Sequence, residues 1–159
     1  MTETVQYMSI TGDELVERLR VHGKLFVAYA LSLAQRAGLD PVEADDVFLR
    51  PLMPTEAPTT ATTPEETHHW IELEAAAVEA VHGSAQVERE GSEWRVNVPV
   101  ADDLDALRIW DVAPDYWAAW MDQHVSRVAA RHGLTGSATL LENTLYLTFA
   151  PATGHAGPR

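Results

Sequence analysis

Residues 12–38, GDELVERLRVHGKLFVAYALSLAQRAG, form the longest periodic segment of the chain. Its apolar and aromatic side chains recur at spacings of three and four residues, which places them on one face of a helix. The residues of this face are Leu15, Leu19, His22, Phe26, Tyr29, Leu33 and Ala37. Thr11 is a suitable N-cap and Gly38 a suitable C-terminal stop. We expect the face to be buried against the rest of the domain, with the ionisable His22 in its middle.

Composition is ordinary for a globular domain: 159 residues, of which 46% are hydrophobic and 22% charged. With no cysteine, a disulfide or a thiolate nucleophile is excluded. We see no apolar run long enough for a membrane span and no signal peptide, so we expect a cytoplasmic domain without a membrane partner. The net charge of −13 repels phosphate backbones, so we expect no nucleic-acid partner.

The remaining segments predict an α+β fold. In order they are a short helix or turn at 41–49, a helix at 64–82, strands at 84–90, 93–99 and 107–112, a helix at 114–132, and strands at 138–142 and 145–149. Thr63-Pro64-Glu65-Glu66 is typical of a capping box at a helix start. The order helix-helix-β-β-β-helix-β-β predicts one domain, 1–150, with an antiparallel sheet of about five strands and long helices packed on one face.

Two segments do not fit a helix or a strand. Residues 51–64 are rich in proline and threonine, and we expect either a lid over a pocket or a plain linker. Residues 151–159 are expected to form a disordered tail.

Three ionisable residues lie on the apolar faces of three different helices: His22, Glu74 and His124. A carboxyl group beside histidines in an apolar setting is suited to general acid–base catalysis, or to one divalent metal as an alternative. The competing interpretation is purely structural: each histidine donates to a backbone carbonyl, and Glu74 pairs with Arg18 or Arg131 at a helix edge. Lys24, the only lysine, falls on the polar side of its helix, which disfavours Schiff-base chemistry.

A second pair, His68 and Glu72, has the four-residue spacing at which two side chains can share a metal. The pair lacks a third ligand and lies on a face that we expect to be solvated. We therefore interpret it as surface residues and expect no metal there.

Five tryptophans could line an aromatic pocket or simply form core: Trp70, Trp94, Trp110, Trp117 and Trp120. The inward faces of the helices suggest a set of ligand-binding candidates, namely Trp70, Trp117, Trp120, Tyr29, Met121 and Arg131.

The closing helix leads into the hairpin SATLLENTLYLTF at 137–149. This layout, over residues 66–149, resembles the small-molecule-binding domains of the vinyl-reductase type and the related L-2-amino-thiazoline-4-carboxylate hydrolase-like family. The resemblance implies a compact pocket between helices and sheet that serves a ligand sensor or a cofactor-free hydrolase. Members commonly carry cysteines in the second half and this chain has none, so no functional residue is carried over. The excess of arginine over lysine, with abundant alanine, suggests a GC-rich bacterial genome and specialised metabolism.

Together these features predict a small-molecule-binding domain that works as a cofactor-independent hydrolase, lyase or cyclase. Glu74 would act with His22 or His124 as acid and base. Two alternatives remain open: a non-catalytic sensor or carrier, and an accessory protein whose acidic surface docks a basic partner. A homodimer also remains open.

Overall fold

The computed structural model describes residues 12–48 and 63–152. Its elements are α1 (Gly12–Arg36), α2 (Pro41–Phe48), α3 (Pro64–His82), β1 (Gln86–Glu90), β2 (Glu93–Pro99), α4 (Ala101–Ile109), α5 (Pro114–Arg131), β3 (Leu134–Leu141) and β4 (Thr144–Pro151). The expected lid or linker at 51–64 lies outside the described residues except for its last two positions. The expected tail at 151–159 lies outside them from position 153 onward, and Pro151 is the last residue of β4.

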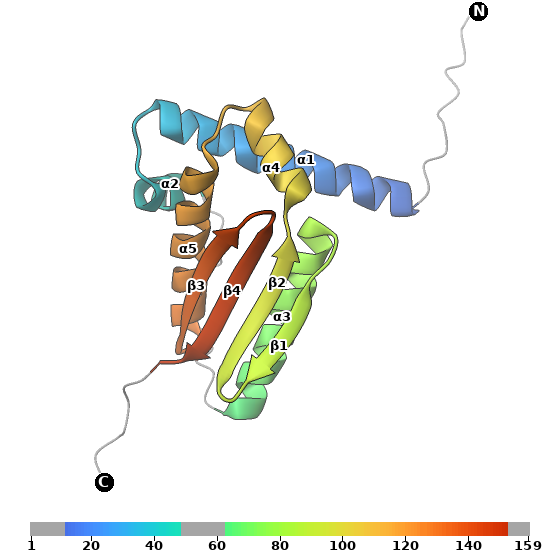
Figure 1. Cartoon of the computed structure of the whole chain (residues 1–159), viewed down its shortest axis with the longest axis vertical. Coiled ribbons are helices and arrows are strands. Elements are labelled where there is room, and N and C mark those ends of the chain that lie inside the picture. Colours follow the sequence, from blue (N-terminus) through green and yellow to red (C-terminus); the bar gives the residue numbers. More distant parts are fainter. Residues whose placement is uncertain (1–11, 49–62, 153–159) are drawn as a thin grey trace, which may run out of the picture.

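The strands form one antiparallel sheet in the order β1-β2-β4-β3. Each hairpin follows its own long helix, α3 before β1 and α5 before β3, so two units of the same helix-strand-strand order meet where β2 pairs with β4. Figure 1 shows α5 running along β3 and α3 running along β1 and β2, with α1, α2 and α4 gathered at one end. The predicted α+β fold with helices on one face is confirmed, with four strands among the described residues instead of about five.

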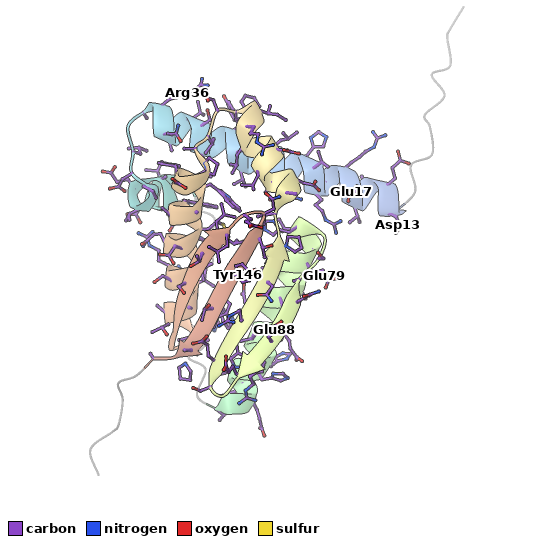
Figure 2. The ribbon with its side chains drawn as sticks, viewed as in Figure 1. Asp13, Glu17, Arg36, Glu79, Glu88 and Tyr146 are labelled. Carbon is purple, nitrogen blue, oxygen red and sulfur yellow. The ribbon has the colours of Figure 1, made fainter. Side chains whose placement is uncertain are left out.

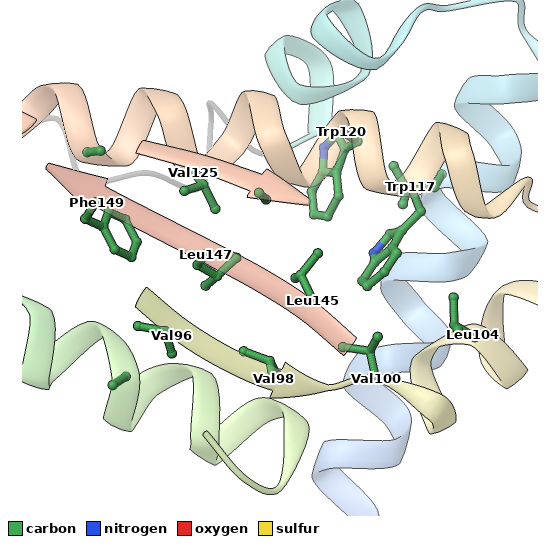
Figure 3. Close-up of a cluster of buried hydrophobic side chains, with 14 of the residues drawn as sticks. Val96, Val98, Val100, Leu104, Trp117, Trp120, Val125, Leu145, Leu147 and Phe149 are labelled. Carbon is green, nitrogen blue, oxygen red and sulfur yellow. The ribbon is translucent and has the colours of Figure 1, made fainter. Parts of the chain in front are cut away.

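The core lies between this face of the sheet and the two helices. The register pairs Trp94 with Phe149 and Val96 with Leu147, and all four side chains are buried. On the neighbouring positions the strands carry polar residues, so the alternation of inward apolar and outward polar side chains follows the pleat. Figure 3 shows Val96 and Val98 of β2 and Leu145 and Leu147 of β4 in one cluster with Trp117 and Trp120 of α5.

The third strand predicted at 107–112 is wrong. Residues Ala101–Ile109 form α4 instead, with Asp102 and Asp103 in its first turn, where the helix dipole favours acidic groups. Leu104 and Leu107 lie three residues apart on its buried side. The β-forming side chains of LRIWDV suggested a strand, but the acidic helix start and the three-residue apolar spacing determined the outcome.

The buried face predicted for α1 is also wrong. Phe26 is 67% exposed and Leu19 62% exposed, and His22 is exposed as well. The buried residues of α1 are Lys24, Ala28, Leu31, Ser32 and Ala34, on the other side of the helix. These are mostly small side chains, which let α1 approach the elements that it contacts, α2, α3 and α4. Lys24, expected in solvent, is therefore in the interior.

The start of α3 agrees with its predicted capping box. The hydroxyl of Thr63 accepts a hydrogen bond from the Glu66 backbone at 3.1 Å, and the Glu66 carboxylate accepts one from the Thr63 backbone at 2.9 Å. Gly83 ends the helix in the left-handed conformation, with φ of 97°. Within residues 12–48 and 63–152, no helix has both the length and the apolar character that crossing a membrane requires.

Candidate functional site

A cavity of about 260 Å³ lies between α3 and α5 on the covered face of the sheet. α3 packs on β1 and β2, whereas α5 packs on β3, so the helices flank the central pair of strands. Val96 of β2 and Leu147 of β4, which face each other in the register, form part of the floor. The apolar lining consists mainly of Val27, Ala28, Ala77, Val78, Val81, Val96, Leu107, Trp117, Trp120, Met121, Val125, Val128, Leu147 and Phe149. α1 and α4 contribute the remaining wall.

Two aromatic rings of α5 form one side of the cavity. Trp117 and Trp120 are both buried, and Figure 3 shows their rings extending from α5 toward Leu145 and Leu147 of β4. The indole nitrogen of Trp120 is buried without a hydrogen-bond partner among the described residues. It is therefore a free donor next to the cavity.

Glu74 is the most unusual polar group of the lining. It projects from α3 among apolar side chains and makes no hydrogen bond or ion pair with any described residue. Burial raises the pKa of the Glu74 carboxyl, because the charged form loses hydration that nothing replaces. An unpaired carboxyl group in an apolar cavity is costly for stability and is typical of a functional position.

At the end of the cavity near α1 and α4 lies a buried ionic cluster of Lys24, Asp103 and His82. Lys24 Nζ is 3.3 Å from Asp103 Oδ2, and His82 Nδ1 is 3.0 Å from Asp103 Oδ1. These are ion-pair distances, but neither His82 Nδ1 nor Asp103 Oδ2 has a well-aligned hydrogen bond. The cluster joins three helices, α1, α3 and α4, so it fixes the end wall of the cavity.

On the α5 side, His124 lines the cavity and is held from behind by α2. Its Nδ1 is 3.2 Å from Oδ1 of the buried Asp45, whose other oxygen accepts from Arg127 at 2.7 Å. The ring of His124 stacks on Trp120, with centroids 5.7 Å apart and planes inclined by 15°. When Nδ1 of the neutral ring donates to Asp45, the lone pair of Nε2 remains available as a base.

The structure brings together five of the nine residues selected from the sequence. Glu74, His124, Trp117, Trp120 and Met121 all line the cavity.

The other four lie elsewhere. His22 is exposed, and Tyr29 is 43% exposed beside Trp110, with their ring centroids 4.8 Å apart. Trp70 packs between His132 and Phe149 in the core, and Arg131 is half-buried near the end of α5.

The alternative metal site at His22, Glu74 and His124 is not formed, because His22 is not part of the cavity. No group of three metal-ligating side chains occurs in the described parts of the chain. His68 and Glu72 form an exposed pair at 3.1 Å, as expected of surface residues.

Four polar residues of the site were missed from the sequence: Lys24, His82, Asp103 and Asp45. A signal for Lys24 did exist. It is a lone lysine on a helical face of small residues that includes Ala28, and such a face is typical of close helix packing. Asp45, His82 and Asp103 carried no comparable signal, because their partners are distant in the chain.

No family model, curated protein or solved structure matches this chain. The resemblance in layout to the vinyl-reductase type therefore remains a prediction, and the function has to be argued from the cavity itself.

Proposed function

We propose that the protein binds a small apolar molecule bearing a positively charged amine in the cavity between α3 and α5, with Glu74 as its counter-ion. The observation that supports this most directly is the unpaired Glu74 carboxyl group among apolar side chains, with its pKa raised by burial. An ammonium group would restore the electrostatic partner that Glu74 lacks, and the apolar part of the ligand would cover the hydrophobic lining.

The surroundings favour a cation in two further ways. Trp117 and Trp120 offer indole faces, which attract ammonium groups through their quadrupole. The net charge of −13 attracts cations to the protein from a distance. Lys24 does not oppose this, because its charge is already paired with Asp103.

The size of the cavity sets the scale of the ligand. At about 30 Å³ for each water-sized group, the volume of about 260 Å³ holds roughly nine non-hydrogen atoms. A suitable probe is 2-phenylethylamine, with 2-phenylethanol as a neutral compound of the same shape and phenylacetate as an anionic one.

The test is a titration of the protein with each of the three probes, monitored by calorimetry and by tryptophan fluorescence. We expect 2-phenylethylamine to bind best, and Glu74→Gln to weaken it by roughly 10–100-fold, the effect of losing a charge-assisted hydrogen bond. The same substitution should leave 2-phenylethanol nearly unchanged. Glu79→Gln is the matched control, since Glu79 is an exposed glutamate of the same helix. Equal affinities for the three probes, or an amine affinity insensitive to Glu74→Gln, would refute the proposal.

A second candidate function is acid–base catalysis as a cofactor-independent hydrolase, lyase or cyclase. It is favoured by the contact of Asp45 with His124, which resembles the way a carboxylate orients a catalytic base. Glu74, with its raised pKa, would serve as the acid. A panel of small amine, ester and amide substrates followed by mass spectrometry separates the two functions. Product that is lost in both His124→Asn and Glu74→Gln would favour the enzyme, and saturable binding without product would favour the carrier.

A further inference from the structure

The outward face of α1 carries a regular apolar stripe, which we call the α1 seam. Its members, at successive spacings of 4, 3, 4, 3 and 4 residues, are Leu15, Leu19, His22, Phe26, Tyr29 and Leu33. The regular alternation of four- and three-residue spacings is the heptad pattern of a coiled-coil interface, narrower than the broad stripe of a helix that packs on a globular core. The five apolar members are 43–67% exposed.

The opposite side of α1 is the side that packs on its own domain. Lys24, Ala28, Leu31 and Ala34 are buried there. Figure 1 shows the N-terminal half of α1 extending beyond the sheet. The largest exposed apolar patch of a protein is often functional, and a continuous stripe of this kind is a candidate interaction surface.

We propose that the α1 seam is the interface of a two-fold symmetric homodimer, in which α1 pairs antiparallel with α1 of a second copy. The seam is complementary to itself in this orientation. Pairing about the level of Lys24 produces the layers Leu15–Leu33, Leu19–Tyr29 and His22–Phe26, each of which occurs twice. No member of the seam is left without a partner, as a closed two-fold interface requires.

The helix dipoles favour the antiparallel orientation. Asp13 and Arg36 lie at opposite ends of α1 (Figure 2), and neither has an ion-pair partner among the described residues. Antiparallel pairing sets the two helix dipoles in opposite directions, which is favourable, and it places Arg36 of one helix at the level of the acidic first turn of the other. Parallel pairing would align the two dipoles, which is unfavourable.

The surface is large enough for a specific dimer. The seam and the adjacent Val16, which is 52% exposed, present on the order of 500 Å² per protomer, so a pair would bury about 1,000 Å², the lower range of specific interfaces. The seam lies on the other side of α1 from Lys24 and the cavity, so this proposal does not depend on ligand binding.

The first test is the mass of the full-length chain in solution, measured by sedimentation equilibrium. We expect a dimer that Phe26→Glu weakens by about 30-fold or more, the effect of losing one interface hot spot. Leu73→Glu is the matched control, because Leu73 is 55% exposed on another helix. Circular dichroism should show both variants folded, since both side chains are exposed. A monomeric native chain, or equal effects of the two substitutions, would overturn the proposal.

The second test determines orientation, and the lack of native cysteine makes it unambiguous. In the antiparallel dimer, the two copies of position 15 lie about 27 Å apart along the axis, at 1.5 Å per residue over 18 residues. We therefore expect Leu15→Cys and Leu33→Cys proteins to form a disulfide when mixed and none when oxidised separately. A disulfide in Leu15→Cys alone would overturn the antiparallel dimer. Dimerisation that appears only after removal of residues 1–11 would assign the native seam to that segment and overturn the proposal.

Discussion

Replacing Gly136 by alanine should destabilise the protein, because α5 leaves no room for a methyl group on β3. A Cβ at this position would lie 2.6 Å from Ala129 Cβ and 2.9 Å from the backbone oxygen of Val125. Carbon atoms in contact prefer about 3.5–4.0 Å, so the overlap is about 1 Å. Neither neighbour can turn away, since one atom is backbone and the other is a fixed Cβ.

Relief of this overlap requires α5 to move away from β3, which would loosen the packing around the fully buried Ala129. Overpacking of a core costs about 1–3 kcal/mol, and we expect the upper end because a backbone oxygen is involved. The cavity is also lined by α5, so the affinity for an amine probe should fall with the stability.

The assay is equilibrium unfolding in urea, followed by tryptophan fluorescence and evaluated at a common m-value. Gly23→Ala is the matched control: it lies inside α1 with no atom within 4 Å of the added Cβ. Gly23→Ala is expected to raise the free energy of unfolding by about 0.5–1 kcal/mol, because alanine has the higher helix propensity. The second substitution Ala129→Gly should partly rescue Gly136→Ala by removing the 2.6 Å contact. A loss smaller than about 0.5 kcal/mol, well below the overpacking range, would refute the packing described for α5 and β3.

Three further substitutions test the site and the start of α3. Burial raises the pKa of Glu74, so the stability contributed by its proton is present below the unfolded-state pKa and is lost as pH rises through the folded-state pKa. Glu74→Gln should therefore raise the free energy of unfolding at pH 8 and change it little at pH 4, as measured by urea titration. A larger gain at pH 4 than at pH 8 would contradict the raised pKa. Asp103→Leu should lower the free energy of unfolding by about 3–5 kcal/mol, because it leaves Lys24 buried without its nearest partner. The double variant with Lys24→Met should recover most of that loss. Additive losses from the two substitutions would exclude an energetic coupling between Lys24 and Asp103. Thr63→Ala should cost about 1 kcal/mol through the capping box, measured by thermal unfolding with the exposed Ser92→Ala as control.

Elements whose signals are local could be predicted from the amino-acid sequence alone. The capping box at Thr63 and the extent of the helix at 64–82 depend on side chains within a few residues, and the structure confirms both. The strands expected at 93–99 and 145–149 correspond to β2 and β4. Their buried positions alternate because only one face of each strand is covered.

Which faces of the helices are buried depends on contacts between segments that are distant in the chain. Periodicity grouped Leu19, Phe26 and Tyr29 correctly on one side of α1, but it carried no information about which side meets a neighbour. Burial depends on segments that are distant in the chain, and α1 packs through a face of small residues around Lys24 instead. The same limit explains the site. Glu74 and His124 were recognised from their own helices, whereas Asp103 became part of the cavity only because α4 meets α1 and α3 there.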